Sequence, residues 1–271
     1  MNWKQTLFWS FSAAAIFYYF LLFGVFVFVG QEEMQLFIPE WWYIREFLFQ
    51  PGGFCAVAGQ WIIQYYRQPM SAVVFHTVLL VGCGFMVYRI LRCFSDKTYL
   101  LFLSLLPVLY LVKMSIHGEY LVDGTVGVVL MLLALSVSLK VRRAGSIAGY
   151  GIASTLFLCG LTGFLSVCYA FLYTLVALLR YKTSRQRLAA SACLIPALFI
   201  YLFSGWLGIP VPLSDGWMPE AYLEIQRLPH YYMYRVWTFF TLSIVGVALF
   251  ARFVPVIGEK SKWMDRVALV V

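Results

Sequence analysis

The stretch TLFWSFSAAAIFYYFLLFGVFVFVG, residues 6–30, contains no charged residue and is preceded by Lys4. A helix needs about 20 consecutive apolar residues to cross a hydrocarbon core about 30 Å thick, so this stretch is long enough to span a bilayer. It is also longer than the apolar segment of about 7 to 15 residues that characterises a cleavable signal peptide. We therefore predict a first membrane-spanning helix that is retained in the protein.

The composition of the whole chain agrees with this prediction. Hydrophobic residues make up 62% and charged residues 12% of the sequence, and the mean hydropathy is +0.83. Soluble domains average about 45–50% apolar and about 25% charged residues. Aromatic residues reach 19%, with 9 Trp and 18 Tyr, the residue types that settle at the headgroup level of a membrane. The composition predicts an all-α, polytopic transmembrane helical bundle.

The apolar stretch 147–180 decides the number of crossings. As one helix it would be about 51 Å long, well beyond the hydrocarbon thickness. We predict a break at 160–163, where Gly160 and Gly163 relieve the backbone constraint, which gives two short spans or a re-entrant hairpin. The total is about eight spans, and the others are predicted at 70–91, 98–113, 119–139, 188–206 and 232–253.

The chain is predicted to form a single membrane-embedded domain over 1–271, with external loops at 31–69 and 207–231. The first loop carries an aromatic run around Trp41 and Trp42 and breaks at Pro51. It favours two short amphipathic helices lying in the headgroup plane, the second over 54–67. The membrane-anchoring role of such an aromatic belt explains much of this loop.

Basic residues collect on one side of the predicted layout. With a cytoplasmic N-terminus, the inner loops hold Lys4, Arg89, Arg92, Lys97, Lys140, Arg142, Arg143, Arg180, Lys182, Arg185, Arg187, Arg252, Lys260, Lys262 and Arg266. A single crossing at 147–180 would put one basic cluster on the wrong side, so the parity of the crossings also favours the break. Most acidic residues fall outside. The location predicted is the inner, cytoplasmic membrane of a bacterium, and the net charge of +8, spread over short loops, excludes nucleic-acid binding.

The sequence gives no pattern typical of a metal or cofactor. Its six cysteines include no C-x-x-C pair, so neither a zinc site nor a disulfide framework is predicted. The residues His117, Glu119 and Asp123 form a loop cluster that could bind a metal, but His117 and Glu119 would lie on one side only in an extended segment, and we interpret the cluster as a solvated interface. We predict no metal and no cofactor.

The first loop resembles a known family. The residues concerned are Glu33, Gln35, Leu36, Phe37, Pro51, Gly52, Gly53, Gly59, Gln64, Tyr65, Tyr66 and Pro69. This pattern resembles an uncharacterised family of multi-pass membrane proteins from Bacteroidota, a domain of unknown function. The resemblance implies further spans and a soluble helical portion, which would make this chain the N-terminal part of a longer protein. It implies no activity.

The order of first span, interfacial loop helices and later spans is similar to that of GT-C glycosyltransferases, which carry a catalytic carboxylate just after the first span. Glu32 and Glu33 occupy that position. The likeness implies that these carboxylates activate an acceptor hydroxyl at the outer face. The phosphate of a polyprenyl-phosphate-linked sugar would be held by cationic side chains, for which the candidates are Arg45, Arg67, Arg227 and Arg235.

Two other classes of function remain open. A transporter of a small solute would use polar residues inside the spans, and His76 is the main candidate, although a histidine there is more often bonded to a neighbouring helix. A non-catalytic structural or assembly subunit would need no site and would use the external loops to contact other membrane proteins. Membrane lipids are expected partners in each case.

Overall fold

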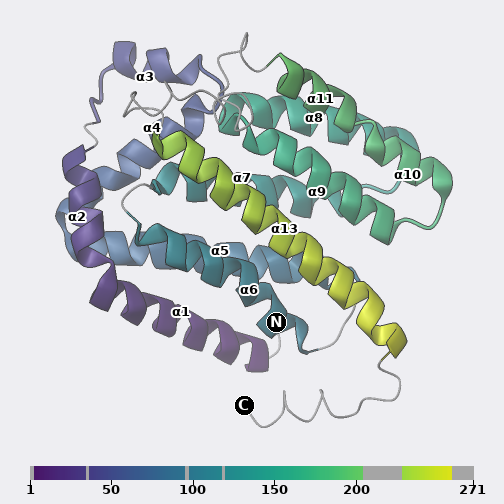
Figure 1. Cartoon of the computed structure of the whole chain (residues 1–271), viewed down its shortest axis with the longest axis horizontal. Helices are drawn as coiled ribbons and strands as arrows, with labels where there is room; N and C mark the ends of the chain where they lie inside the picture. Colours follow the sequence, from purple (N-terminus) through teal and green to yellow (C-terminus); the bar gives the residue numbers. More distant parts are fainter. Residues whose placement is uncertain (1–2, 35–36, 95–97, 118–119, 204–227, 258–271) are drawn as a thin grey trace.

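The computed structural model of this protein describes residues 3–34, 37–94, 98–117, 120–203 and 228–257 (Figure 1). Within these ranges every regular element is a helix, which confirms the all-helical class. The elements are α1 (Trp3–Phe23), α2 (Val25–Met34), α3 (Trp41–Leu48), α4 (Gly53–Ile63), the 3-10 turn η1 (Gln64–Arg67), α5 (Pro69–Leu91), α6 (Leu100–Ser115), α7 (Val122–Ser138), α8 (Ala144–Thr162), α9 (Leu165–Arg180), α10 (Ser184–Ser191), α11 (Leu194–Leu202) and α13 (Leu228–Ile257).

Three of the described helices, α1, α5 and α8, are long and apolar enough to span a membrane. Four further segments are apolar but shorter, namely α6, α7, α9 and the part of α13 from Val236 to Phe250. The long helices also expose large apolar side chains, among them Phe11 on α1 at 75% and Phe157 on α8 at 68%. Such an apolar surface suits lipid better than water.

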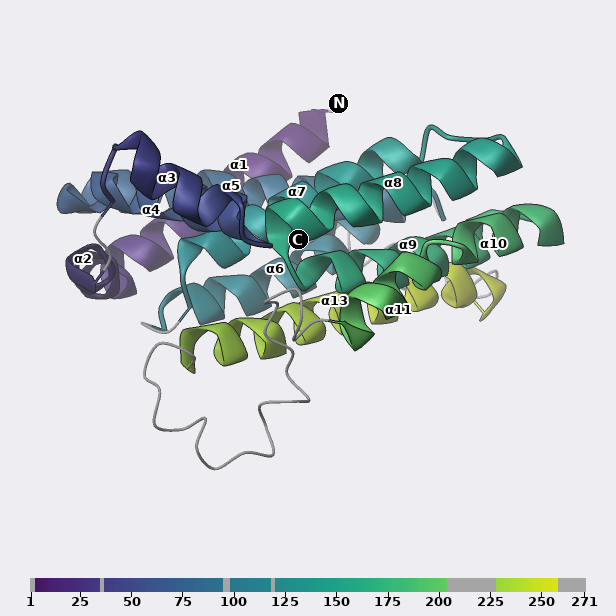
Figure 2. The ribbon, with the colours of Figure 1, turned by 90° about the horizontal axis from the view of Figure 1, so that it is seen from above.

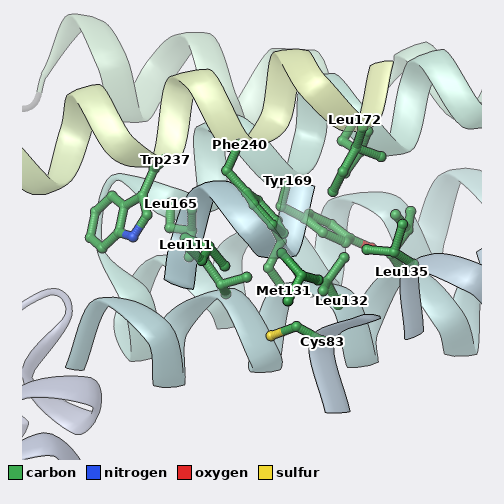
Figure 3. Close-up of a cluster of buried hydrophobic side chains, with 14 of the residues drawn as sticks. Cys83, Leu111, Met131, Leu132, Leu135, Leu165, Tyr169, Leu172, Trp237 and Phe240 are labelled. Atoms are coloured by element: carbon green, nitrogen blue, oxygen red, sulfur yellow. The ribbon is translucent and has the colours of Figure 1, made fainter. Parts of the chain in front are cut away.

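The core lies where α5, α6, α7, α9 and α13 meet (Figure 3). Cys83 of α5, Met131 of α7 and Tyr169 of α9 are fully buried there, together with Phe240 of α13. The helix α13 closes this core because it runs along both α6 and α9 (Figures 1 and 2). Segments far apart in the sequence are thus fixed relative to one another by interlocking apolar side chains.

The bundle has two chemically different ends (Figure 1). At one end α2, α3 and α4 lie near the start of α7, and the carboxylates of Glu32 and Asp123 are found there. We call this the acidic end. At the other end α10 packs against α8 and α9 and bonds to the carbonyl of Arg142 after α7, and the charges of Arg89 near the end of α5 and Arg180 at the end of α9 both act on Cys93. We call this the basic end.

The break predicted at 160–163 lies where the sequence places it. Helix α8 ends at Thr162 and α9 begins at Leu165. Between them Gly163 has a φ of +62°, a left-handed conformation that a residue with a Cβ atom rarely adopts. The backbone N–H of Gly52 donates to the carbonyl of Gly160 at 3.0 Å, so the loop between α3 and α4 closes over this turn.

Two predicted spans are not single straight helices. The first, 6–30, is divided at Gly24 into α1 and α2, and α2 turns away from α1 (Figure 1). The seventh, 188–206, is divided between α10 and α11. There Pro196 has no N–H to donate to the carbonyl of Ala192, and its ring would clash with that carbonyl, so α10 cannot continue.

Two short helices, α3 and α4, occupy the first predicted loop, but α4 differs from the expectation of a helix lying free in the headgroup plane. It packs against α7 and α8, and Cys55, Gly59 and Ile63 are buried. One face keeps Trp61 exposed. Burial of small residues lets α4 approach α7 closely and makes it part of the bundle wall at the acidic end.

Candidate functional site

Helix α2 is directed over the acidic end by the bend at Gly24. A Cβ atom at this position would lie 2.8 Å from the Phe28 ring and 3.0 Å from the carbonyl oxygen of Phe20. The first distance is shorter than real Cβ contacts, so the Phe28 ring would have to shift, and the second is a tight contact. The bend therefore depends on Gly24, and it lets Phe28 fold back against the rest of the bundle.

Beneath α2 lies a buried histidine. The rings of Phe28 and His76 stack with centroids 4.3 Å apart and planes 11° from parallel. His76 Nε2 and the hydroxyl of Tyr66 share a hydrogen bond of 2.8 Å, and all three side chains are fully buried. His76 Nδ1 has no hydrogen-bond partner within the part of the chain that the structure describes. As the sequence analysis expected of a histidine here, His76 bonds to a neighbouring element, the turn η1.

One turn further along α2, Gln31 fastens the helix to the start of α7. Its Nε2 atom donates a hydrogen bond of 2.9 Å to the backbone carbonyl of Tyr120, and the two residues are 1% and 0% exposed. The hydroxyl of Tyr120 accepts a hydrogen bond of 3.2 Å from Thr125. Burial raises the pKa of the Tyr120 phenol, which keeps it neutral. Gln31 Oε1 is buried without a partner among the described residues.

Next to this contact lies Asp123, in the first turn of α7. Its Oδ1 atom accepts a hydrogen bond of 2.6 Å from the backbone N–H of Gly124. A carboxylate in the first turn is favoured by the positive end of the helix dipole. Gly59 of α4 lies directly against it, since a Cβ atom there would be 2.6 Å from Asp123 Cβ. On the other side, Trp237 Nε1 donates to the carbonyl of Gly124 at 3.3 Å. Asp123 therefore lies where α4, α7 and α13 converge.

Cys55 of α4 packs against α7, since a Cβ atom at Gly127 would lie 3.6 Å from its Sγ atom. Burial raises the pKa of its thiol, and the negative charge of Asp123 raises it further. The thiol is therefore neutral and serves as a packing group. Across the described side chains, residues 3–32, 37–94, 98–117, 120–203 and 236–250, no three His, Cys, Asp or Glu residues gather closely enough to hold a metal ion.

The predicted catalytic residues lie at this end of the bundle. Glu32 follows Gln31 in the last turn of α2 and is half-buried. The dipole of α2 disfavours a carboxylate at this C-terminal end by about 0.3–1 kcal/mol. Among the described residues none forms an ion pair with Glu32. Glu33 is in the same turn, and its side chain lies outside the described part.

The predicted phosphate-binding residues are less closely gathered. Arg45 on α3 is exposed, with its guanidinium 5.7 Å from the centre of the Phe49 ring, and Arg67 at the end of η1 is also exposed. In the described part of the chain neither pairs with a carboxylate. Arg227 lies outside the described residues, as does the side chain of Arg235. The role of these four arginines stays a prediction.

Gln31, Tyr66, Tyr120 and Asp123 were not singled out as site residues from the sequence. The only signal for Gln31 was its place beside Glu32. Asp123 was interpreted as a solvated loop residue, although it belongs to the first turn of α7. The hydrogen bond of Gln31 joins positions 89 residues apart. Among the carboxylates described at or near this end, Glu32 and Asp123 belong to α2 and α7, and the buried hydrogen bond from Gln31 to Tyr120 joins the end of α2 to the segment just before α7. A carboxylate can take a proton from a bound hydroxyl group or return it.

Comparison with known proteins gives a family but no activity. A family profile described as "Family of unknown function (DUF6057)" matches residues 1–268. No curated protein and no solved structure matches the chain. A functional argument must therefore come from the residues themselves.

Proposed function

This chain belongs to the family of unknown function DUF6057, and from its own residues we propose that it transfers a sugar from a polyprenyl-phosphate donor at the outer face of a bacterial cytoplasmic membrane. In this proposal the acidic end faces outward and the N-terminus is cytoplasmic. The plan is that of a GT-C-like enzyme, with catalysis at the end of α2.

Several features support a multi-pass membrane location. The long apolar helices α1, α5 and α8 suit complete crossings, and α6, α7, α9, α10 with α11, and α13 bring the total to about eight. Apart from Arg45 and Arg67 in the first loop, the basic residues of the described loops collect at one end and the described carboxylates at the other. This separation agrees with the tendency of cytoplasmic loops to retain Lys and Arg.

The observation that carries the proposed catalysis is the position of Glu32. Its carboxylate is half-buried at the unfavoured end of its helix, and no described cation neutralises it. Its neighbour Gln31 holds this helix end to Tyr120 by a buried hydrogen bond. A charged group that the fold holds rigidly in an unfavourable position is typical of a catalytic residue.

The proposed reaction uses Glu32 as a general base, with Glu33 and Asp123 as further carboxylates at this end. Glu32 takes the proton of an acceptor hydroxyl, whose oxygen attacks the anomeric carbon of the donor sugar. The bond from that carbon to the phosphate oxygen breaks, and polyprenyl phosphate leaves with the electron pair. Arg45, Arg67, Arg227 and Arg235 are the groups proposed to hold this phosphate.

Transfer from radiolabelled polyprenyl-phosphate sugars by the full chain in lipid nanodiscs tests the proposal. We expect donor-dependent release of polyprenyl phosphate that Glu32→Gln abolishes. Glu46→Gln on α3 is the matched control, since this carboxylate is exposed at the same end, and it should retain activity. Full activity of Glu32→Gln, or no transfer from any polyprenyl-phosphate sugar by folded wild-type protein, would overturn the proposal.

Transport of a small solute is a second candidate, favoured by His76. This side chain is fully buried within α5, and its Nδ1 atom has no hydrogen-bond partner among the described residues. Unsatisfied polar atoms inside a spanning helix mark solute or proton paths. Uptake into proteoliposomes that is lost in His76→Phe and kept in Glu32→Gln would favour this candidate.

A further inference from the structure

The loop after α7 and the loop after α9 are joined into one surface at the basic end. The Tyr181 hydroxyl donates a hydrogen bond of 2.8 Å to the carbonyl of Val141, and Gln186 Nε2 donates one of 2.8 Å to the carbonyl of Arg142. Within the second loop, Arg187 Nε donates to the carbonyl of Tyr181 at 2.8 Å. These bonds hold together residues that are 40 and 44 positions apart in the sequence, so the fold sets how the two loops lie.

The two joined loops carry exposed basic side chains that together form what we call the basic surface. Its members are Lys140, Arg142, Arg143, Lys182, Arg185 and Arg187. Helices α8 and α10 begin within this surface, at Ala144 and Ser184, and neither N-cap side chain caps its helix. The positive ends of two helix dipoles therefore add to the charge of the side chains. The basic surface is suited to several anionic groups arranged side by side.

Apolar side chains are exposed next to these charges. Leu188 on α10 directly follows Arg187 and is 75% exposed, and Ile195 on the next helix, α11, is 72% exposed. Helix α8, which begins at the basic surface, is long and apolar enough to cross a membrane. Cations beside exposed apolar side chains are typical of the headgroup level of a bilayer, where Lys and Arg reach the phosphates and leucine reaches the acyl chains. This combination favours a lipid surface over an acidic, water-soluble protein as the partner.

We propose that the basic surface binds the headgroups of anionic phospholipids in the cytoplasmic leaflet. Clusters of about four to eight Lys and Arg residues next to a spanning helix attract such headgroups. The guanidinium groups donate paired hydrogen bonds to a phosphate, and the lysines add charge. The inference rests on the proposed membrane location and orientation. It does not rest on the proposed sugar transfer, because the basic surface lies at the opposite end of the bundle from Glu32.

The test measures lipid binding to the full chain in detergent by native mass spectrometry. It compares phosphatidylglycerol with phosphatidylcholine of the same acyl chains, and the wild type should bind phosphatidylglycerol more tightly. Lys140→Gln combined with Lys182→Gln removes one charge from each loop and should weaken phosphatidylglycerol binding about thirtyfold without changing phosphatidylcholine binding. The matched control is Lys4→Gln combined with Lys113→Gln. It removes two exposed lysines of α1 and α6, outside the basic surface, and should keep the wild-type affinity.

Loss of phosphatidylglycerol binding in the first double variant and not in the control supports the proposal. Equal losses in both would indicate attraction to the net charge alone and overturn it, as would unchanged binding in the first variant. Equal affinity of the wild type for the two lipids would also overturn it, because the charged headgroup would then contribute nothing. If thermal melting shows that the first variant does not fold, Arg142→Gln combined with Arg185→Gln takes its place with the same expected result, and unchanged binding there overturns the proposal.

Discussion

Phe28 covers His76, with the two rings stacked 4.3 Å apart. One residue belongs to α2 and the other to α5, so this contact joins the segment beyond the Gly24 bend to the most enclosed of the three long apolar helices. His76 Nε2 remains hydrogen-bonded to the Tyr66 hydroxyl, and the side chains of Phe28, Tyr66 and His76 are all shielded from solvent. The position of α2, and with it that of Glu32, depends on this buried group.

Replacing Tyr66 by Phe removes the hydroxyl that bonds His76 Nε2 and leaves both ring nitrogens without a described partner. We expect the free energy of unfolding to fall by about 1–3 kcal/mol because a buried polar atom loses its partner. Thermal melting in detergent measures this. The neighbouring Tyr65 is 44% exposed, so Tyr65→Phe should melt like the wild type. Equal melting of both variants would contradict the importance of this bond.

Gly24→Ala would place a methyl group 2.8 Å from the Phe28 ring. The ring cannot move aside without leaving His76, so we expect a loss of about 1–3 kcal/mol in stability. Gly30 lies in α2, with nothing within 4 Å of its Cβ position. Gly30→Ala should therefore be neutral or gain up to about 1 kcal/mol from helix propensity. Melting temperatures that fall equally in both variants would show that the bend does not depend on Gly24.

Gly59→Ala tests the approach of α4 to α7. The added methyl group would lie 2.6 Å from Asp123 Cβ and 2.9 Å from its Cα atom. Backbone atoms of a packed helix cannot move aside like a side chain, so we expect a loss at the upper end of about 1–3 kcal/mol. Gly82→Ala on α5, where nothing lies within 4 Å, is the control. A stable Gly59→Ala protein would mean that α4 and α7 are farther apart than described.

The helix pattern was largely predictable where a residue carries its own backbone signal. The break at Gly163 could be predicted because the apolar stretch is too long for one crossing and glycine tolerates its φ of +62°. The bend at Gly24 could not, since it depends on Phe28 folding onto His76, a residue of another helix. The sequence analysis did not predict the division before Pro196, because it judged the span 188–206 by its apolar residues and not by the proline within it.

The candidate site was only partly predictable. Glu32 could be predicted as a candidate from its sequence position alone, directly after the first span. The residues that hold Glu32 in position come from distant segments. The hydrogen bond from Gln31 goes to the backbone carbonyl of Tyr120, which any residue type at that position would offer, so the sequence does not reveal it. Asp123 looked like a solvated residue because its burial arises from α4 and α13, which pack on it from other parts of the chain.

Cys93 provides a test of orientation in the wild-type protein. It is the exposed member of the six cysteines, and it lies at the basic end, which we propose to be cytoplasmic. A membrane-impermeant maleimide should label it only from the cytoplasmic side of membrane vesicles, and Cys93→Ser should remove the signal. Labelling from the outer side alone would reverse the proposed orientation.

The rate of this labelling should also depend on pH and on Arg180. Maleimide reacts with the thiolate, and the raised pKa of Cys93 leaves little thiolate near neutral pH. The rate should therefore increase about tenfold per pH unit while the pH stays below that pKa. Because the charge of Arg180 lowers the pKa, Arg180→Gln should slow labelling at a fixed pH, whereas Arg185→Gln should leave it unchanged. Equal rates in the wild type and Arg180→Gln would place Arg180 too far from Cys93 to act on it.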